Sequence, residues 1–139
     1  MKSRVVLSSL VALALSTLTS PVRAGDTLDT PAENTTFQYY EHFIVSGQAT
    51  ADTYYVELQL VYLDDQAHIN FVMQDNVWPG RAPDGTYVWS DYNFYMLPAG
   101  NDPMNGAGVY QIRALFFGMD QFHNLVLQQV INHQIWPTQ

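Results

Sequence analysis

The chain has 139 residues, of which 47% are hydrophobic, 13 are acidic and 5 are basic, and it contains no cysteine. This length predicts one domain, and the hydrophobic fraction is too high for a disordered acidic tail. The absence of cysteine excludes disulfides, thiolate nucleophiles and thiolate-bound zinc or iron–sulfur centres.

Residues 1–24 have the features of a secretory signal peptide. Lys2 and Arg4 precede a largely apolar run over residues 5–15, and Val22 and Ala24 occupy the −3 and −1 positions of a cleavage site. The apolar run is about half of the ~20 residues that a transmembrane helix needs. We therefore expect cleavage after Ala24 and a secreted or periplasmic mature protein.

Removal of this segment makes the remaining chain strongly acidic. Residues 25–139 keep all 13 acids but only two basic residues, Arg81 and Arg113, so the net charge is −11 over 115 residues. Nucleic acid and anionic membranes would be repelled. Because no lysine remains, Schiff-base chemistry and a phosphate-binding P-loop are also excluded, and we expect a neutral, cationic or metal-ion partner.

The rest of the chain is predicted to be all-β. Residues 25–36 are polar and are predicted to form a flexible N-terminal arm. From residue 37 onward, apolar and polar residues alternate with the period of a strand, and no window has a capped helical stripe. The clearest strand is 53–63, whose apolar face consists of Tyr54, Val56, Leu58, Leu60 and Tyr62. The other predicted strands are 37–45, 69–73, 92–97, 108–117 and 125–135, with a short one at 87–90.

Six to eight strands in about 100 residues are typical of a single antiparallel β-sandwich, which we predict for residues 37–139. A closed barrel is the alternative. Two long connections, 75–85 and 98–107, are rich in Gly, Pro, Asn and Asp. The first contains Trp78 and Arg81. Trp78 either packs back on the end of the sandwich, which we favour, or stays exposed for a ligand.

Two turns share the pattern Asp-Gln-x-His, at Asp65–His68 and Asp120–His123. In a sandwich of this kind we expect both turns at the same end, where Asp64 would join them. Imidazole with carboxylate ligands suits Zn²⁺, Cu²⁺ or Ni²⁺, and the carboxylates alone would suit Ca²⁺. The ordinary alternative, which we favour, is that these are solvated hairpin residues and that the protein has no cofactor.

Three segments resemble the secreted immunoglobulin-like domains of bacteria. They are PAENTTFQYYEHFIVSGQA at residues 31–49, the strand at 54–60, and GVYQIR at 108–113. The resemblance implies an immunoglobulin-like sandwich used for adhesion, carbohydrate binding, inhibition or assembly. Residues 84–90 (DGTYVWS), followed by PAG at 98–100, are similar to small bacterial proteinase inhibitors of this fold, although their second Trp is missing here.

We expect a binding module and not an enzyme. The chain has no Gly-x-Ser-x-Gly turn and no His-Glu-x-x-His motif, and sequence alone cannot locate a pair of hydrolytic carboxylates. Sugar rings stack on aromatic faces, so Tyr40, Tyr55 and Trp78 are predicted to bind carbohydrate. Arg81, in the same connection as Trp78, is predicted to contact the ligand with them. The alternative is a protein-interaction domain, since 125–135 is apolar on both faces and could accept a partner strand at an edge. The expected partner is a neutral polysaccharide or another protein.

Overall fold

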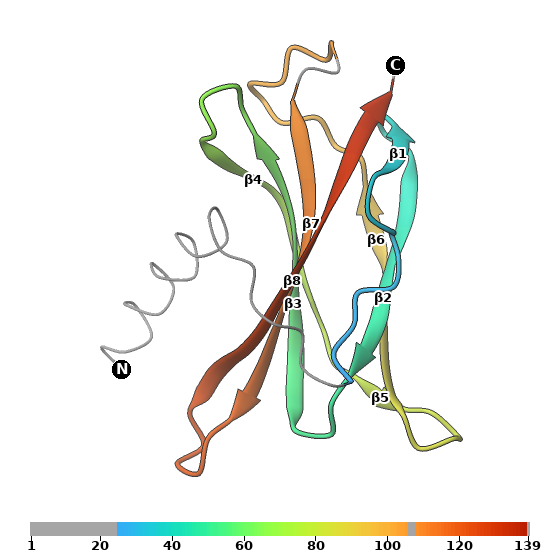
Figure 1. Ribbon diagram of the computed structural model, residues 1–139, viewed down its shortest axis with the longest axis vertical. Helices are drawn as coiled ribbons and strands as arrows, with labels where there is room; N and C mark the ends of the chain where they lie inside the picture. Colours follow the sequence, from blue (N-terminus) through green and yellow to red (C-terminus); the bar gives the residue numbers. More distant parts are fainter. Residues whose placement is uncertain (1–24, 106–107, 139) are drawn as a thin grey trace.

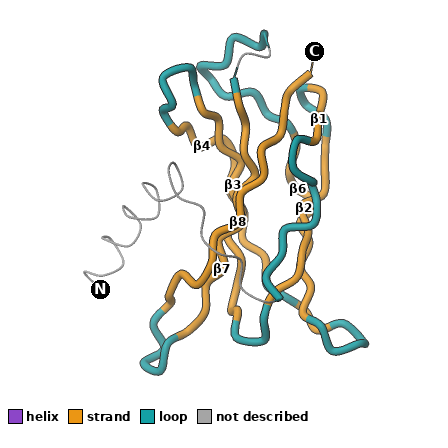
Figure 2. Tube along the Cα trace, in the orientation of Figure 1, coloured by secondary structure: helices purple, strands orange, loops and turns teal. Residues whose placement is uncertain are grey.

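The computed structural model describes residues 25–105 and 108–138, so the predicted signal peptide lies outside the described residues. This part of the chain is all-β and contains no helix (Figure 2). Its eight strands are β1 (Thr35–Gln38), β2 (His42–Ala49), β3 (Thr53–Leu63), β4 (Ile69–Val77), β5 (Gly80–Arg81), β6 (Tyr87–Tyr95), β7 (Val109–Met119) and β8 (Leu125–Thr138).

The strands form two sheets that face each other as layers (Figure 1). One sheet has the order β1-β8-β7-β3-β4, and the other has the order β2-β6-β5. All pairs are antiparallel except β1 with β8, which is parallel. The prediction of an all-β protein is confirmed, and the alternative of a closed barrel is wrong, because the described strands divide into two separate sheets.

The core lies between the sheets and follows the alternation in the sequence. From β7 it takes Tyr110, Ile112, Ala114 and Phe116, all fully buried. From β3 it takes Val56, Leu58, Leu60 and Tyr62. Tyr54 was predicted to join them but is 50% exposed, because the register shifts between Thr53 and Tyr55 and leaves Tyr54 as an extra residue of the strand.

The predicted strand over 37–45 is two strands in different sheets. β1 ends at Gln38 and β2 begins at His42, with a turn between them in which Tyr40 has a φ of 69°. Conversely, the two short strands predicted at 87–90 and 92–97 are one continuous strand, β6.

The segment predicted as a flexible arm is packed against β2. The amides of Thr27 and Asp29 donate to the carbonyls of Gln48 and Ser46, and Leu28 is buried in the core. At the other end of the chain, β8 was predicted as an edge strand, but β1 covers its last four residues.

Candidate functional site

The two Asp-Gln-x-His turns lie at opposite ends of the molecule. The first turn follows β3 and the second follows β7, and these strands are antiparallel neighbours. Leu63, just before the first turn, pairs with Val109 at the start of β7, whereas Thr53 pairs with Gly118, just before the second turn. Figure 1 shows the turn before β4 at the top of the view and the turn before β8 at the bottom. The expectation that Asp65, His68, Asp120 and His123 converge is therefore wrong.

The two turns nevertheless have the same conformation. Their equivalent residues differ by one position from those that the Asp-Gln-x-His repeat aligns. The Asp64 carboxylate accepts hydrogen bonds from the amides of Gln66 and His68. The Asp120 carboxylate accepts from those of Phe122 and Asn124 in the same way. Ala67 and His123 take the left-handed position, with φ of 62° and 61°. The structural counterpart of Asp120 is thus Asp64, and not Asp65.

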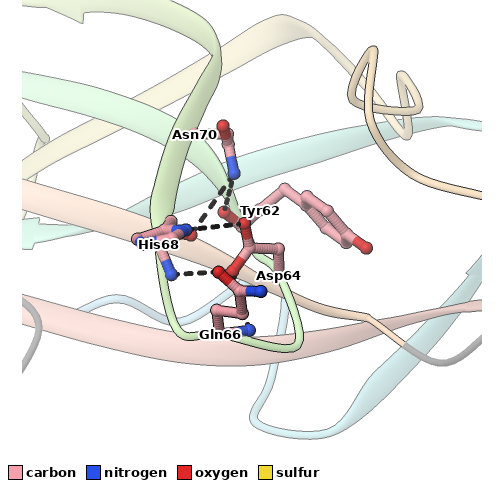
Figure 3. A network of polar contacts seen from close by, with 5 residues as sticks. All are labelled: Tyr62, Asp64, Gln66, His68 and Asn70. Atoms are coloured by element: carbon pink, nitrogen blue, oxygen red, sulfur yellow. Dashed lines mark hydrogen bonds and ion pairs between the residues drawn. The ribbon is translucent and has the colours of Figure 1, made fainter.

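These backbone hydrogen bonds lower the pKa of both carboxyl groups. The amide of His68 does most to lower the pKa of Asp64, and the amide of Asn124 does the same for the pKa of Asp120. Figure 3 shows that the first turn satisfies its own polar groups: the His68 ring nitrogen Nδ1 lies 3.2 Å from Asp64 Oδ2, and the Asn70 amide approaches the carbonyls of Tyr62 and His68. Across residues 25–105 and 108–138, no group of three or more His, Asp or Glu side chains could hold a metal ion.

The residues predicted to bind a ligand fall into two places. Trp78 is 61% exposed and does not pack back into the core, contrary to the interpretation that we favoured. Its ring centroid lies 6.2 Å from that of Tyr55, which in turn stacks on Phe117 at 5.0 Å. Arg81 on β5 is exposed and pairs with Tyr87 at the same end of the molecule. Tyr40 is at the opposite end, where its amide donates to the carbonyl of Met96.

Two surface depressions adjoin at Trp78. One has a volume of about 440 Å³ and extends over β2 and β6. The other, of about 460 Å³, lies between the edges of β4 and β6. The residues around the first include Asp29, Ser46, Gln48, Trp78, Val88 and Ser90. Those around the second include Asp75, Asn76, Trp78, Asp91, Tyr92 and Asn93. Exposed aromatic rings and hydrogen-bonding groups therefore share one surface.

No pattern in the sequence indicates the carboxyl pair in the second depression. Asp91 on β6 is 3% exposed, and its side chain hydrogen bonds with that of Asp75 on β4. Burial, followed by this hydrogen bond, raises the pKa of Asp91 to about 6, while hydrogen bonds from Asp91 and Asn93 lower the pKa of Asp75. Burial and the contact with Asp75 therefore favour the protonated form of Asp91, which can donate to Asp75. No spacing rule predicts such a pair, because its members lie on strands of different sheets.

This pair is too close for the usual carboxylate mechanism of glycoside hydrolysis. That mechanism needs the two carboxyl groups about 5 to 9.5 Å apart, with the scissile bond between them. Asp75 and Asp91 are in hydrogen-bonding contact, and Asn93 bonds to both. Its backbone amide donates to Asp91 Oδ1 at 2.7 Å, and its side-chain Nδ2 donates to Asp75 Oδ2 at 3.0 Å. The arrangement supplies hydrogen-bonding groups and leaves no space between the acids for a sugar linkage.

Arg113 is the second of the two basic residues in 25–139 and is fully buried. It lies on the face of β7 opposite the core, and its Nε and Nη2 donate to Gln111 Oε1 at 3.1 and 3.0 Å. Burial lowers the pKa of Arg113 to about 10, so the guanidinium remains charged at neutral pH. This positive charge is inside the protein and does not reach the surface around Trp78.

Comparisons with known protein families and with curated proteins found no match to this chain. Within the described residues, no helix has the length and apolarity needed to cross a bilayer.

Proposed function

We propose that the mature chain is a secreted, non-catalytic binding module that holds neutral carbohydrate at the surface around Trp78. The observation that carries this proposal is the exposed indole of Trp78, beside the Tyr55 ring and between two depressions lined by hydroxyl, amide and carboxyl groups. Sugars have apolar ring faces and polar edges, so they suit a surface that combines flat aromatic rings with hydrogen-bonding groups.

We further propose that the sandwich is immunoglobulin-like. In immunoglobulin domains, strands C, F and G share one sheet and strands B, E and D share the other. The order β8-β7-β3 supports an equivalence to G-F-C, and β2-β6-β5 supports one to B-E-D. β4, beside β3, would then correspond to the additional C′ strand of variable-type domains. The signal-peptide features of residues 1–24 support a secreted or periplasmic location.

The test is binding to a panel of neutral polysaccharides, measured for the mature chain and for Trp78→Ala. The stacking ring contributes apolar contact, so its loss should weaken binding at least about tenfold. Because the ring is exposed, the melting temperature should not change. Phe71→Ala is the matched control, since Phe71 is 57% exposed and lies outside both depressions. Tyr40→Ala should also retain binding. Retention of binding by Trp78→Ala would contradict the proposed site.

A protein-interaction domain is the second candidate, and it rests on β8. In the described chain β1 pairs with β8 only from Ile135 to Thr138, which leaves the earlier part of that edge without a strand. Such an edge can accept a strand from a partner. Val126→Lys, on this exposed part, should then abolish co-purification of a specific envelope partner that Trp78→Ala retains. The reverse result would favour the Trp78 surface.

A further inference from the structure

The two depressions at Trp78 form one continuous surface. Both are lined by Trp78 and Ser90, and each has a volume of roughly 450 Å³, within the ~300 to 1,000 Å³ range of ligand sites. The first lies on the outer side of β2 and β6, and the second lies at the open edge between β4 and β6. A ligand that filled both would cross β6 next to the exposed indole.

Each depression has its own hydrogen-bonding groups. Ser46 and Gln48 line the first, and Asn76 and Asn93 line the second. Ser90 belongs to both. A sugar unit in either depression would therefore meet side chains that can bind its hydroxyl groups. A single sugar could use only one of these sets, whereas a chain of sugars could use both.

The charge of this surface restricts the ligand further. Asp29 lines the first depression, and Asp75 and Asp91 line the second, while none of the residues that line them is basic. Arg113 is buried elsewhere, and Arg81, although exposed at this end of the molecule, lines neither depression. The mature chain carries a net charge of −11. A polysaccharide made of uronic acids would therefore be repelled from the surface.

Building on the proposed function, we infer that the Trp78 surface takes a linear, uncharged oligosaccharide of at least two sugar units, with one unit in each depression. Trp78 lies where the units join. The site thus recognises an internal segment of a neutral polysaccharide, and it discriminates against single sugars and against acidic chains.

Titration with chains of increasing length tests this inference. The mature protein is titrated with cello-, manno-, xylo- and malto-oligosaccharides of one to six units, and with oligogalacturonates of the same lengths. At least one neutral series should bind about tenfold or more tightly at four units than at one, because each added set of hydrogen bonds strengthens binding by several-fold. The oligogalacturonates should bind at least about tenfold more weakly than the neutral chains.

Two variants test whether both depressions contribute to the tighter binding of longer oligosaccharides. Gln48→Ala removes a group from the first depression and Tyr92→Ala removes one from the second, and both side chains are exposed, so the melting temperature should stay unchanged. Each variant should bind the four-unit oligosaccharide more weakly, with an affinity closer to that for the single sugar. Equal affinity for one and four units, or binding of oligogalacturonate as tight as that of a neutral chain, would overturn the inference while leaving carbohydrate binding in place. If no neutral series binds at any length, the proposed function falls as well.

Discussion

Asp102 and the Asp75–Asp91 pair are both held by hydrogen bonds in the fold, but their surroundings differ. The Asp102 carboxylate accepts the hydroxyls of Tyr39 at 2.9 Å and Tyr110 at 2.5 Å, and also the amide of Met104. Burial and this carboxylate raise the pKa of both tyrosines. All three of these partners are donors, so Asp102 joins the segment 98–105 to Tyr39 and to Tyr110 near the start of β7.

The Asp75–Asp91 pair instead brings two acceptors together. One of the two must be protonated to donate to the other, so the contact depends on the protonation of Asp91, whose pKa is the raised one. It lies beside an exposed Trp and an exposed Tyr, at an edge where the two sheets are not joined by strand pairing. A carboxylate surrounded by donors thus stabilises the fold, whereas two facing carboxyls leave a titratable group beside the surface where we place the ligand.

The largest effect is expected from Asp102→Ala. This change leaves the hydroxyls of Tyr39 and Tyr110 without their acceptor, and Tyr110 is fully buried. We expect the free energy of unfolding to fall by about 2 to 3 kcal/mol, measured by urea denaturation. Asp84→Ala is the control, because the Asp84 side chain only accepts from Thr86 in an exposed turn. Equal losses in the two variants would contradict a special contribution of Asp102 to stability. Carbohydrate binding by Asp102→Ala, measured well below its melting temperature, should persist.

A smaller effect, with a distinct pH dependence, is expected from Asp91→Asn. The folded-state pKa of about 6 exceeds the ordinary value of 3.8. The stability that this group contributes is therefore complete below about pH 4 and is lost as the pH rises through 6. Asparagine can still accept from the Asn93 amide and donate to Asp75, so it mimics the protonated acid at every pH. The variant should match the unchanged protein near pH 4.

Near pH 7.5 the Asp91→Asn variant should be more stable by on the order of 1 kcal/mol, a value reduced for screening by water in the depression. Thermal unfolding at several pH values measures this difference between the two proteins. The same measurement on Asp84→Asn supplies the control, which should show no such trend between pH 5 and 7. A difference that does not vary with pH would show that the contact between Asp75 and Asp91 does not depend on the protonation of Asp91.

The sequence predicted those features that depend on neighbouring residues in the chain. The period-2 alternation of β3 and β7 identified their buried faces, because side-chain direction alternates locally along any strand. Tyr54 was misplaced because a bulge depends on the partner strand. Trp78 was misplaced for a similar reason. Whether its ring is covered depends on the β4–β5 connection, which crosses from one sheet to the other.

The features that depend on strand direction and pairing could not be predicted. The repeat aligned Asp65 with Asp120, although hydrogen bonding aligns Asp64 with Asp120. The two turns were expected at one end because the predicted topology placed them there. They lie at opposite ends because β3 and β7 are antiparallel neighbours, which the sequence does not show. Asp75 and Asp91 lie on β4 and β6, in different sheets, and only the packing of those sheets brings them together.

The smallest expected effect concerns these two turns, one at the Asp102 end and one at the other end. Asp64→Ala and Asp120→Ala each remove a carboxylate that accepts two backbone amides, so each should lower the free energy of unfolding by about 0.5 to 1 kcal/mol. Asp65→Ala changes an exposed residue and should alter it by less than about 0.5 kcal/mol. Urea denaturation of the three variants checks this. Equal losses for Asp64→Ala and Asp120→Ala would show that the two turns stabilise the fold equally. A loss of stability for Asp65→Ala as large as that for Asp120→Ala would instead indicate that Asp65 is the counterpart of Asp120, as the sequence repeat aligns them.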